Sequence, residues 1–370
     1  MKILVAAGGS GGHIFPASAL IHELERTRKQ VSFIFVISGR DQERMITGYL
    51  KESLLEFTVK ISPLIPLRGR GIFAKVDFLA HLLWGAVYSF FLVLLERPRI
   101  VIGFGGYLSA PLIVAGCILR LPTLIHEQNV YPGRANLILA HIADRVALSF
   151  AASKGYFRKK AKLTVTGNPL RQDLQAMDRQ LAARILGLNP DIFTILVLGG
   201  SQGATAINKK IVRLLEDIKK QKLTLQFIHI AGKKDFPEIM QAYENSGLAG
   251  KAFPFLKDMG LAYSSSDLVI TRAGASTLNE LSYLAKPAMA IPYPYAAGHQ
   301  LLNARYYAER GALILLEEKD LTSELLFSCI CEIIKDKDKR NSMSERIKEL
   351  SCPSAAQLLA AEVRNLIYAH

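Results

Sequence analysis

A histidine follows a run of small residues near the start of the chain, Gly8-Gly9-Ser10-Gly11-Gly12-His13. Glycines let the backbone approach a ligand closely, and the helix that such a loop opens favours negative charge at its N-terminus. The same helix N-terminus favours the neutral imidazole, which can accept a proton. We therefore predict that His13 is a general base; the structural alternative is a helix-start residue held by packing. A nicotinamide-binding turn is disfavoured because the spacing is not G-x-G-x-x-G and the second strand ends in Ser38-Gly39-Arg40, without an acidic residue.

The second half of the chain repeats this pattern. Ile195-Leu-Val-Leu-Gly-Gly-Ser-Gln-Gly-Ala204 has the same order of strand, glycine turn and helix start as the segment that ends at His13. Its backbone N–H groups and the Ser201 hydroxyl would hold a diphosphate, and such a site needs no metal. The only D-x-D spelling, Asp336-Lys337-Asp338, lies in a lysine-rich run that indicates a solvated surface and not a metal site.

A third turn, Arg272-Ala-Gly274-Ala-Ser276-Thr277-Leu-Asn-Glu280, follows a predicted strand at 268–271. On the residues alone, two interpretations of Glu280 stay open. Thr277-x-x-Glu280 spells a capping box, in which both side chains cap a helix start and contribute only to stability. A carboxylate beside such a turn can instead accept both ribose hydroxyls of a nucleotide.

Two further polar segments follow predicted strands. His126-Glu127-Gln128-Asn129 ends a strand in the first half, at the edge where open α/β sheets bind their ligands. Pro292-Tyr-Pro-Tyr-Ala-Ala-Gly-His299-Gln300 is a proline-rich loop with hydrogen-bonding side chains. The structural alternative for this loop is an ordinary surface connection.

Short apolar runs alternate with helical patterns along the chain, which is typical of doubly wound parallel sheets. The predicted strands are 3–7, 31–37, 100–104, 123–126, 145–148, 195–198, 226–230, 268–271 and 288–291. Because the strand, glycine turn and helix repeat occurs once in each half, we predict an α/β protein with two Rossmann-like domains, 1–166 and 167–353. Gly167-Asn168-Pro169 marks the break, a polar helix follows at 173–186, and a last helix, 354–370, folds back on the first domain.

Length and composition agree with two domains. The chain has 370 residues, half of them hydrophobic, which is more than one core usually holds. The formal charge of +14 indicates anionic partners: phosphorylated ligands, nucleic acid or acidic lipid headgroups. The four cysteines show neither a C-x-x-C pair nor zinc spacing, in keeping with a reducing cytoplasm. Because the first residues lack signal-peptide features, we expect a protein that is not exported.

Residues 78–95 carry no formal charge and are flanked by Arg68, Arg70 and Lys75 on one side and by Arg97 and Arg99 on the other. Their length is at the threshold for a membrane span. His81, Gly85 and Ser89 form a small or polar stripe at four-residue steps, and a span would separate strands of one predicted sheet. We favour a buried crossover helix or a helix with one face in the lipid interface over a span.

Together and in order, these stretches resemble the MurG family, the UDP-N-acetylglucosamine:lipid I N-acetylglucosaminyltransferases of peptidoglycan synthesis. The similarity runs over nearly the whole chain: GGSGGHIFPA, PLRGRGI, VIGFGGYLSAP, HEQN, TGNPLR, LGGSQGA, FLKDM, RAGASTLNE and GHQLLNAR. The resemblance implies a GT-B fold, in which two Rossmann-like domains face each other across a cleft. It also implies that no metal and no cofactor are required.

The resemblance further implies which residues bind the donor, UDP-GlcNAc. Those near the donor sugar and diphosphate would be Ser10, Gly11, Gly12 and Asn129, with Arg171 and Ser201 on the phosphates. Leu256 would bind the uracil through its backbone, and Gln300 would hold the sugar hydroxyls. The ribose and phosphate site would be lined by Ala275, Ser276, Thr277, Leu278, Asn279 and Glu280, which favours the ribose interpretation of Glu280. His299 stands where some relatives have glutamine, so its contact with the sugar stays open.

The implied reaction inverts the anomeric centre by one in-line displacement, in which the muramyl 4-hydroxyl attacks C1 opposite UDP. His13 is the first candidate for the base and Glu127 the second, while the helix start after Ser201 stabilises the departing diphosphate. The expected partners are UDP-GlcNAc, lipid I, an anionic membrane surface reached through residues 73–95, and a cell-wall synthesis or division complex, but not nucleic acid. The expected location is peripheral, on the cytoplasmic face of the inner membrane. Rival functions are a diacylglycerol glycosyltransferase, a sugar-nucleotide epimerase and a non-catalytic nucleotide-binding protein.

Overall fold

The computed structural model describes residues 1–8, 11–27, 31–40, 43–44, 46–48, 57–64, 72–158, 162–171, 173–199, 204–295 and 298–369, with the backbone alone for 72–76, 78 and 79. The chain divides into two compact units, one formed by Met1–Arg171 with Cys352–His370 and the other by Gln172–Ser351. The division falls slightly later than the expected 166/167 boundary. The Gly167-Asn168-Pro169 turn therefore belongs to the first unit.

The first unit is built on one parallel sheet with the strand order β3-β2-β1-β4-β5-β6-β7. Its strands are β1 (Lys2–Ala6), β2 (Ser32–Ile37), β3 (Phe57–Ile61), β4 (Ile100–Gly103), β5 (Thr123–Glu127), β6 (Arg145–Leu148) and β7 (Leu163–Val165). Its helices are α1 (Gly11–Thr27), α3 (Ile72–Glu96), α4 (Gly106–Ile118), α5 (Arg134–Leu139), the 3-10 helix η1 (Ala151–Tyr156) and α14 (Ala355–Ala369). The order reverses between β1 and β4, and ligands bind at such a switch point in open α/β sheets.

The second unit repeats this plan with the strand order β10-β9-β8-β11-β12-β13. Its strands are β8 (Phe193–Leu198), β9 (Leu225–Ile230), β10 (Gly250–Phe253), β11 (Leu268–Thr271), β12 (Ala288–Ala290) and β13 (Ile314–Leu315). Its helices are α6 (Arg179–Ile185), α7 (Thr205–Lys220), α8 (Phe236–Ser246), α9 (Met259–Ser265), α10 (Ala275–Tyr283), α11 (His299–Ala308), η2 (Glu318–Asp320), α12 (Ser323–Lys335) and α13 (Lys337–Glu349). The repeated glycine turns follow β1 and β8, which occupy equivalent positions in the two sheets.

Four strands that the sequence did not predict, β3, β7, β10 and β13, are the outermost strands of the two sheets. None of their residues is fully buried. An edge strand packs on fewer neighbours than a central one, so its sequence lacks the continuous apolar run that marks a buried parallel strand.

The last helix of the chain, α14, packs on the first unit. Leu359, Val363 and Ile367 recur at four-residue steps and join the core around β1 and α1. Its polar side also makes contacts: Arg145 Nε lies 3.1 Å from Glu362 Oε2. A C-terminal segment thus completes the N-terminal unit.

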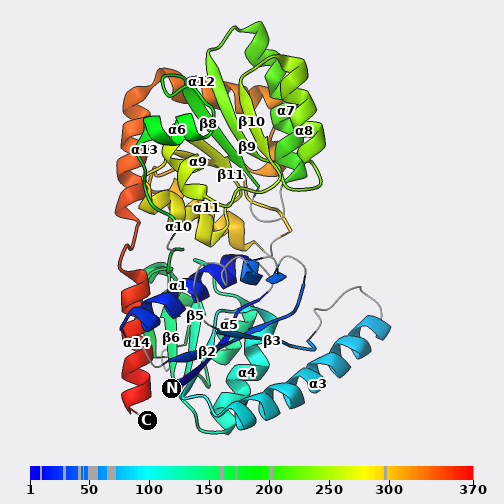
Figure 1. Ribbon diagram of the computed structural model, residues 1–370, viewed down its shortest axis with the longest axis vertical. Coiled ribbons are helices and arrows are strands. Elements are labelled where there is room, and N and C mark those ends of the chain that lie inside the picture. The colour runs from blue at the N-terminus through cyan, green and yellow to red at the C-terminus, as the bar shows by residue number, and fades with distance from the viewer. Residues whose placement is uncertain are drawn as a thin grey trace. The chain divides into compact units, whose positions relative to one another are not determined.

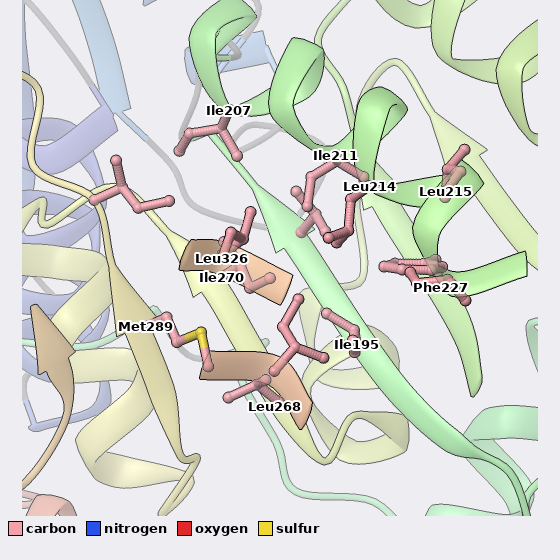
Figure 2. Close-up of a cluster of buried hydrophobic side chains, with 14 of the residues drawn as sticks. Ile195, Ile207, Ile211, Leu214, Leu215, Phe227, Leu268, Ile270, Met289 and Leu326 are labelled. Carbon is pink, nitrogen blue, oxygen red and sulfur yellow. The ribbon is translucent and has the colours of Figure 1, made fainter. Parts of the chain in front are cut away.

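The core of the second unit includes one face of α7 packed on the sheet. Ile207, Ile211, Leu214 and Leu215 lie on one stripe of α7 and pack with residues of the central strands, as Figure 2 shows. All four are at most 2% exposed. Burying such a side chain contributes about 1.5–3 kcal/mol each, so this stripe fixes the position of α7 on the sheet.

The polar helix expected at 173–186 is shorter in the structure. α6 begins only at Arg179, because the Asp178 side chain accepts a hydrogen bond from the Leu181 N–H at 2.9 Å and caps the helix there. Before this cap the chain runs irregularly beside α9, where the Met177 N–H donates to Ser264 Oγ at 2.9 Å. The sequence prediction was wrong at this end because it did not identify Asp178 as the cap.

Several large apolar side chains of helix α3 are exposed, although Leu92 and Val93 near its end are buried. The small residues of the predicted stripe, Gly85 and Ser89, are buried, and Gly85 packs so closely on Leu64 that an added Cβ would lie 2.4 Å from that side chain. Trp84 and Leu95 are 62% and 77% exposed. The expectation of a wholly buried crossover helix is therefore wrong. Among the described residues, no helix is long and apolar enough to cross a membrane.

Candidate functional site

His13 lies in the first turn of α1, and a backbone contact fixes its ring. Nδ1 is 2.7 Å from the carbonyl oxygen of Gly8. Because a carbonyl oxygen only accepts, Nδ1 carries the proton and donates it. In the neutral ring this leaves the Nε2 lone pair as an acceptor, which is the form a general base needs.

The Nε2 side of His13 faces a glycine pair at the start of α4. Gly105 and Gly106 have φ values of 87° and 74°, which favour glycine over residues with a side chain. A Cβ on Gly105 would lie 3.6 Å from Nε2 of His13. These glycines therefore keep the space beside the acceptor nitrogen free of side chains.

Glu127, the other candidate base, ends β5 and is 1% exposed. Its Oε1 accepts hydrogen bonds from the backbone N–H and the side-chain Nδ2 of Asn129, at 2.9 and 3.1 Å. Its Oε2 accepts from the Gly133 N–H at 2.9 Å and from Asn136 Nδ2 at 2.7 Å. Each oxygen accepts two hydrogen bonds, three from the following loop and one from α5, so this carboxylate ties the loop to that helix. The two candidate bases therefore differ: each oxygen of Glu127 already accepts two hydrogen bonds, whereas Nε2 of His13 faces the glycine pair.

The two residues next to Glu127 in the HEQN segment also hold loops. His126 is fully buried; its Nε2–H donates to the Gly167 carbonyl at 3.0 Å, and its Nδ1 accepts from Gln128 Nε2 at 2.9 Å. The Gln128 amide donates to the Phe104 carbonyl as well, at 3.1 Å. Burial lowers the pKa of His126 to about 4, so the ring is neutral near pH 7. This network fixes the loop before α4 and the turn at Gly167 together.

Four of the five predicted donor-binding residues of the first unit are among the described residues. Gly11 and Gly12 open α1, while Ser10 lies outside the described residues. The Arg171 guanidinium is 8% exposed, with Cζ 4.6 Å from the centre of the Phe15 ring in α1. Arg171 thus brings a positive charge close to the first turns of α1. Asn129 accepts a hydrogen bond from Ser153 Oγ at its carbonyl oxygen, at 3.0 Å.

In the second unit, the turn after β11 gives an unexpected helix start. α10 begins at Ala275 with Gly274 as its N-cap, and no side chain caps it. Thr277 is the third residue of the helix, so the predicted capping box of Thr277 and Glu280 is wrong. Glu280 instead accepts a hydrogen bond from the Tyr263 hydroxyl at 2.8 Å, which joins α10 to α9.

The six predicted residues 275–280 fall into a buried group and a half-buried group. Ala275, Leu278 and Asn279 are at most 7% exposed and face the core, and Asn279 Nδ2 donates back to the Ala275 carbonyl at 2.7 Å. The side chains of Ser276, Thr277 and Glu280 are only half-buried. The second group therefore supplies the side chains that a ligand can reach on α10.

The proline-rich loop after β12 is tied down at both ends. Gly298, at φ 79°, precedes α11, and Gln300 Oε1 accepts from the Tyr293 N–H at 2.9 Å. Leu256, the predicted uracil contact, lies half-buried in the loop after β10, and His299 is the first residue of α11. Ser201 and its glycine neighbours 200–203 lie outside the described residues.

Arg272 makes contacts around the proline-rich loop that the sequence did not indicate. It is 7% exposed, and its Nη1 donates to the Ile291 carbonyl at 3.1 Å and pairs with Glu318. Its guanidinium also lies 5.4 Å from the Tyr293 ring centre. Arg272 thus holds the start of the proline-rich loop against β11. Its position directly after a strand was the only available signal.

No group of three or more His, Cys, Asp or Glu in the part of the chain that the structure describes is arranged to hold a metal ion. The sequence-predicted residues that are described follow the carboxyl ends of strands in their own sheet, and those after β1 and β11 lie next to the switch points between β1 and β4 and between β8 and β11. Glycine turns, helix starts and fixed polar loops at such edges are suited to phosphorylated ligands.

The buried histidines of the two units predict a loss of stability in acid. Burial lowers the pKa of His126 to about 4 and that of His229 in β9 to about 3, against 6.5 in the unfolded chain. Below about pH 6.5 the unfolded chain binds protons at these sites that the folded protein does not. Each histidine then reduces the free energy of unfolding by up to about 1.4 kcal/mol per pH unit, until its folded pKa is reached. Calorimetric melts at pH 7.5 and 5 test this, and His126→Gln should show a smaller drop; an equal drop would contradict the assignment.

Comparison with known proteins defines the class. Residues 3–148 match the glycosyltransferase family 28 N-terminal domain, and residues 194–359 match the glycosyltransferase family 28 C-terminal domain. The crystal structure of Acinetobacter baumannii MurG is similar, with a TM-score of 0.75 and 26% identity, covering 98% of this chain and 99% of that one. The chain is therefore a glycosyltransferase with the GT-B fold.

Sequence relatives narrow the class to one family. The UDP-N-acetylglucosamine--N-acetylmuramyl-(pentapeptide) pyrophosphoryl-undecaprenol N-acetylglucosamine transferase of Geobacter sulfurreducens is 35% identical, covering 98% of each chain. That of Desulfotalea psychrophila is 36% identical, covering 99% of this chain and 97% of its own. The chain belongs to this family, the MurG transferases. A UDP-GlcNAc 2-epimerase from Neisseria meningitidis has a TM-score of 0.67 at 14% identity, which indicates a shared fold only.

Proposed function

We propose that the protein transfers N-acetylglucosamine from UDP-GlcNAc to the 4-hydroxyl of the muramyl sugar in lipid I, the undecaprenyl-pyrophosphoryl-MurNAc-pentapeptide. The observation that carries this proposal is family membership at about one-third identity over nearly the full chain. Purified protein incubated with UDP-[14C]GlcNAc should label lipid I and not diacylglycerol. Label in diacylglycerol alone would indicate the rival transferase. Conversion of UDP-GlcNAc to UDP-N-acetylmannosamine would indicate an epimerase.

His13 is the general base in the proposed mechanism. Its ring is held by the Gly8 carbonyl with the Nε2 lone pair toward the glycine pair at α4. The acceptor hydroxyl gives its proton to Nε2 as its oxygen attacks C1, and the bond from C1 to the diphosphate breaks on the opposite face. Glu127 acts as a positioning residue in this scheme, because its four hydrogen bonds fix the loop that carries Asn129.

The donor nucleotide binds to the second unit in this proposal. The half-buried carboxylate of Glu280, oriented by the Tyr263 hydroxyl, accepts the ribose hydroxyls. Backbone N–H groups at the start of α7, with Ser201, stabilise the departing diphosphate, and Arg171 adds a positive charge. The Leu256 backbone takes the uracil, and Gln300, with His299 beside it, takes the sugar hydroxyls.

A membrane surface is the proposed location of the acceptor. Large exposed apolar side chains lie on α3, α4 and α5 and on the turn after α5. Helix α4 contacts both α3 and α5. This α3–α5 patch consists of Leu83, Trp84, Val87, Phe91, Leu94, Leu95, Val114, Ile118, Ile138 and Ile142. Exposed Arg97, Arg99 and Arg120 lie at the ends of α3 and α4. An apolar patch with basic residues at its border suits the interface of an anionic bilayer, and the protein would be peripheral.

Vesicle binding tests the α3–α5 patch. The protein should bind vesicles that contain anionic lipid, and added salt should weaken this binding because it screens the arginines. Trp84→Ser should weaken binding by about tenfold, the effect of losing one large interfacial apolar side chain. Ile185→Ser is the matched control, since Ile185 is 56% exposed on α6 of the second unit. Equal effects of the two variants in a sedimentation assay would contradict the patch, and retention in both high salt and carbonate would indicate a span.

A further inference from the structure

A buried chain of polar side chains joins three elements of the second unit. Asn208 lies in the first turn of α7, His229 near the end of β9, and Tyr243 in α8. Their exposed fractions are 2%, 0% and 5%, and Asp235, which precedes α8, is 8% exposed. Figure 1 shows α7, α8 and β9 as neighbours in this unit. Polar groups so deeply buried are costly unless each one is paired.

Only one arrangement of protons satisfies this chain. Asn208 Nδ2 lies 2.9 Å from both the Ala231 carbonyl and Asp235 Oδ2, which accept its two hydrogens. Asn208 Oδ1 must then accept, so His229 Nε2 carries a proton and donates across 3.0 Å. His229 Nδ1 is left as an acceptor for the Tyr243 hydroxyl at 3.1 Å.

The direction of these bonds is therefore fixed from tyrosine to carboxylate. Burial lowers the pKa of His229 to about 3, so the ring stays neutral and keeps one tautomer. A flipped Asn208 amide would turn its oxygen toward the Ala231 carbonyl and the Asp235 carboxylate, which both repel it. The amide orientation is thus set by its surroundings.

This series of hydrogen bonds passes through the helix start that would receive the donor diphosphate. The Asn208 N–H closes the first turn of α7 on the Ala204 carbonyl at 2.9 Å, while its side chain ties that turn to Ala231 and Asp235 beyond β9. The hydrophobic stripe that begins at Ile207 packs α7 on the sheet, and Asn208 adds directional hydrogen bonds to the first turn. We infer that Asn208 is a positioning residue, which holds the start of α7 in the geometry that binds a nucleoside diphosphate. This inference rests on the proposed function.

The same strand offers a matched control at its other end. Gln226, at the amino end of β9, is 1% exposed. Its Nε2 donates to the Asn189 carbonyl at 2.6 Å and to Thr194 Oγ1 at 2.9 Å, and its Oε1 accepts from the Asn189 N–H at 3.2 Å. This network is as buried and as well paired as that of Asn208. It lies at the amino ends of the strands, whereas the predicted donor site lies at their carboxyl ends.

The test is calorimetric titration of UDP into the full chain. The wild type is titrated first, because failure of the wild type to bind UDP overturns the proposed function itself. Asn208→Leu should weaken UDP binding by about tenfold or more and raise KM for UDP-GlcNAc more than it lowers kcat. Gln226→Leu should lower the melting temperature but leave UDP affinity within about twofold. Equal UDP affinities of wild type and folded Asn208→Leu overturn the inference alone.

A second pair of variants decides the matter if Asn208→Leu does not fold. Asn208→Asp sets a carboxylate against Asp235 and should weaken UDP binding, again by about tenfold. Adding Asp235→Asn restores an amide-to-carboxylate hydrogen bond with donor and acceptor exchanged, so UDP binding should recover measurably. Recovery should be incomplete, because the Ala231 carbonyl still faces an oxygen. A double variant that binds no better than Asn208→Asp overturns the inference.

Discussion

His13→Ala should lower kcat for transfer to lipid I by about a hundredfold or more, which corresponds to about 2.7 kcal/mol of lost transition-state stabilisation. The variant loses the imidazole whose Nδ1 is held by the Gly8 carbonyl and whose Nε2 is the proposed proton acceptor. UDP affinity should hardly change, because the nucleotide binds to the second unit in the proposed mechanism. Steady-state transfer in detergent micelles, with a parallel UDP titration, measures both quantities.

His141→Ala is the control for that experiment, since His141 is an exposed histidine of the same unit. It should retain the turnover of the wild type. Near-normal turnover of His13→Ala would remove His13 from the catalytic role. If Glu127→Gln then also lost turnover without losing stability, the base would be Glu127, despite the hydrogen bonds that saturate its carboxylate.

Glu280→Gln should weaken binding of UDP and UDP-GlcNAc by about tenfold or more, because hydrogen bonds to a charged acceptor contribute about 1.5–3 kcal/mol. Folding should be little affected: the amide oxygen can still accept from the Tyr263 hydroxyl, and Glu280 caps no helix. Calorimetric titration and a thermal melt on the same sample test the two effects separately.

A true cap provides the comparison for the melt. Thr322 Oγ1 accepts from the Leu325 N–H at 3.1 Å at the start of α12, so Thr322→Ala should cost about 1 kcal/mol of stability and leave nucleotide affinity intact. If Glu280→Gln resembles Thr322→Ala in both measurements, Glu280 is structural and takes no part in donor binding.

The sequence indicated the centre of each sheet better than its borders. Central strands such as β1 and β8 are short apolar runs followed closely by glycine, a pattern typical of a buried parallel strand. The outer strands, for example β13, are short and half-buried, and a local pattern does not distinguish them from loops. Their pairing depends on a neighbour that is distant in the sequence.

For the candidate site, too, the sequence predicted features that depend on neighbouring residues and missed those that depend on distant ones. Glycine turns and the histidine after them are local signals, and the sequence located them. The partners that give each polar group its role are not local: Glu280 bonds to Tyr263, and Arg272 to Ile291 and Glu318. The capping box failed for this reason, since the spacing of Thr277 and Glu280 fits a motif whose helix start lies elsewhere.

The position of α14 has a consequence for how the protein is made. The first unit contains both Met1–Arg171 and Cys352–His370, so its core lacks Leu359, Val363 and Ile367 until the end of the chain has been synthesised. The second unit is formed by one continuous segment, so all its residues are synthesised before the first unit is complete. During translation, the unit that emerges first is therefore the last to be completed. Apolar residues around β1 and α1 stay exposed to solvent until α14 has been synthesised and packs on them.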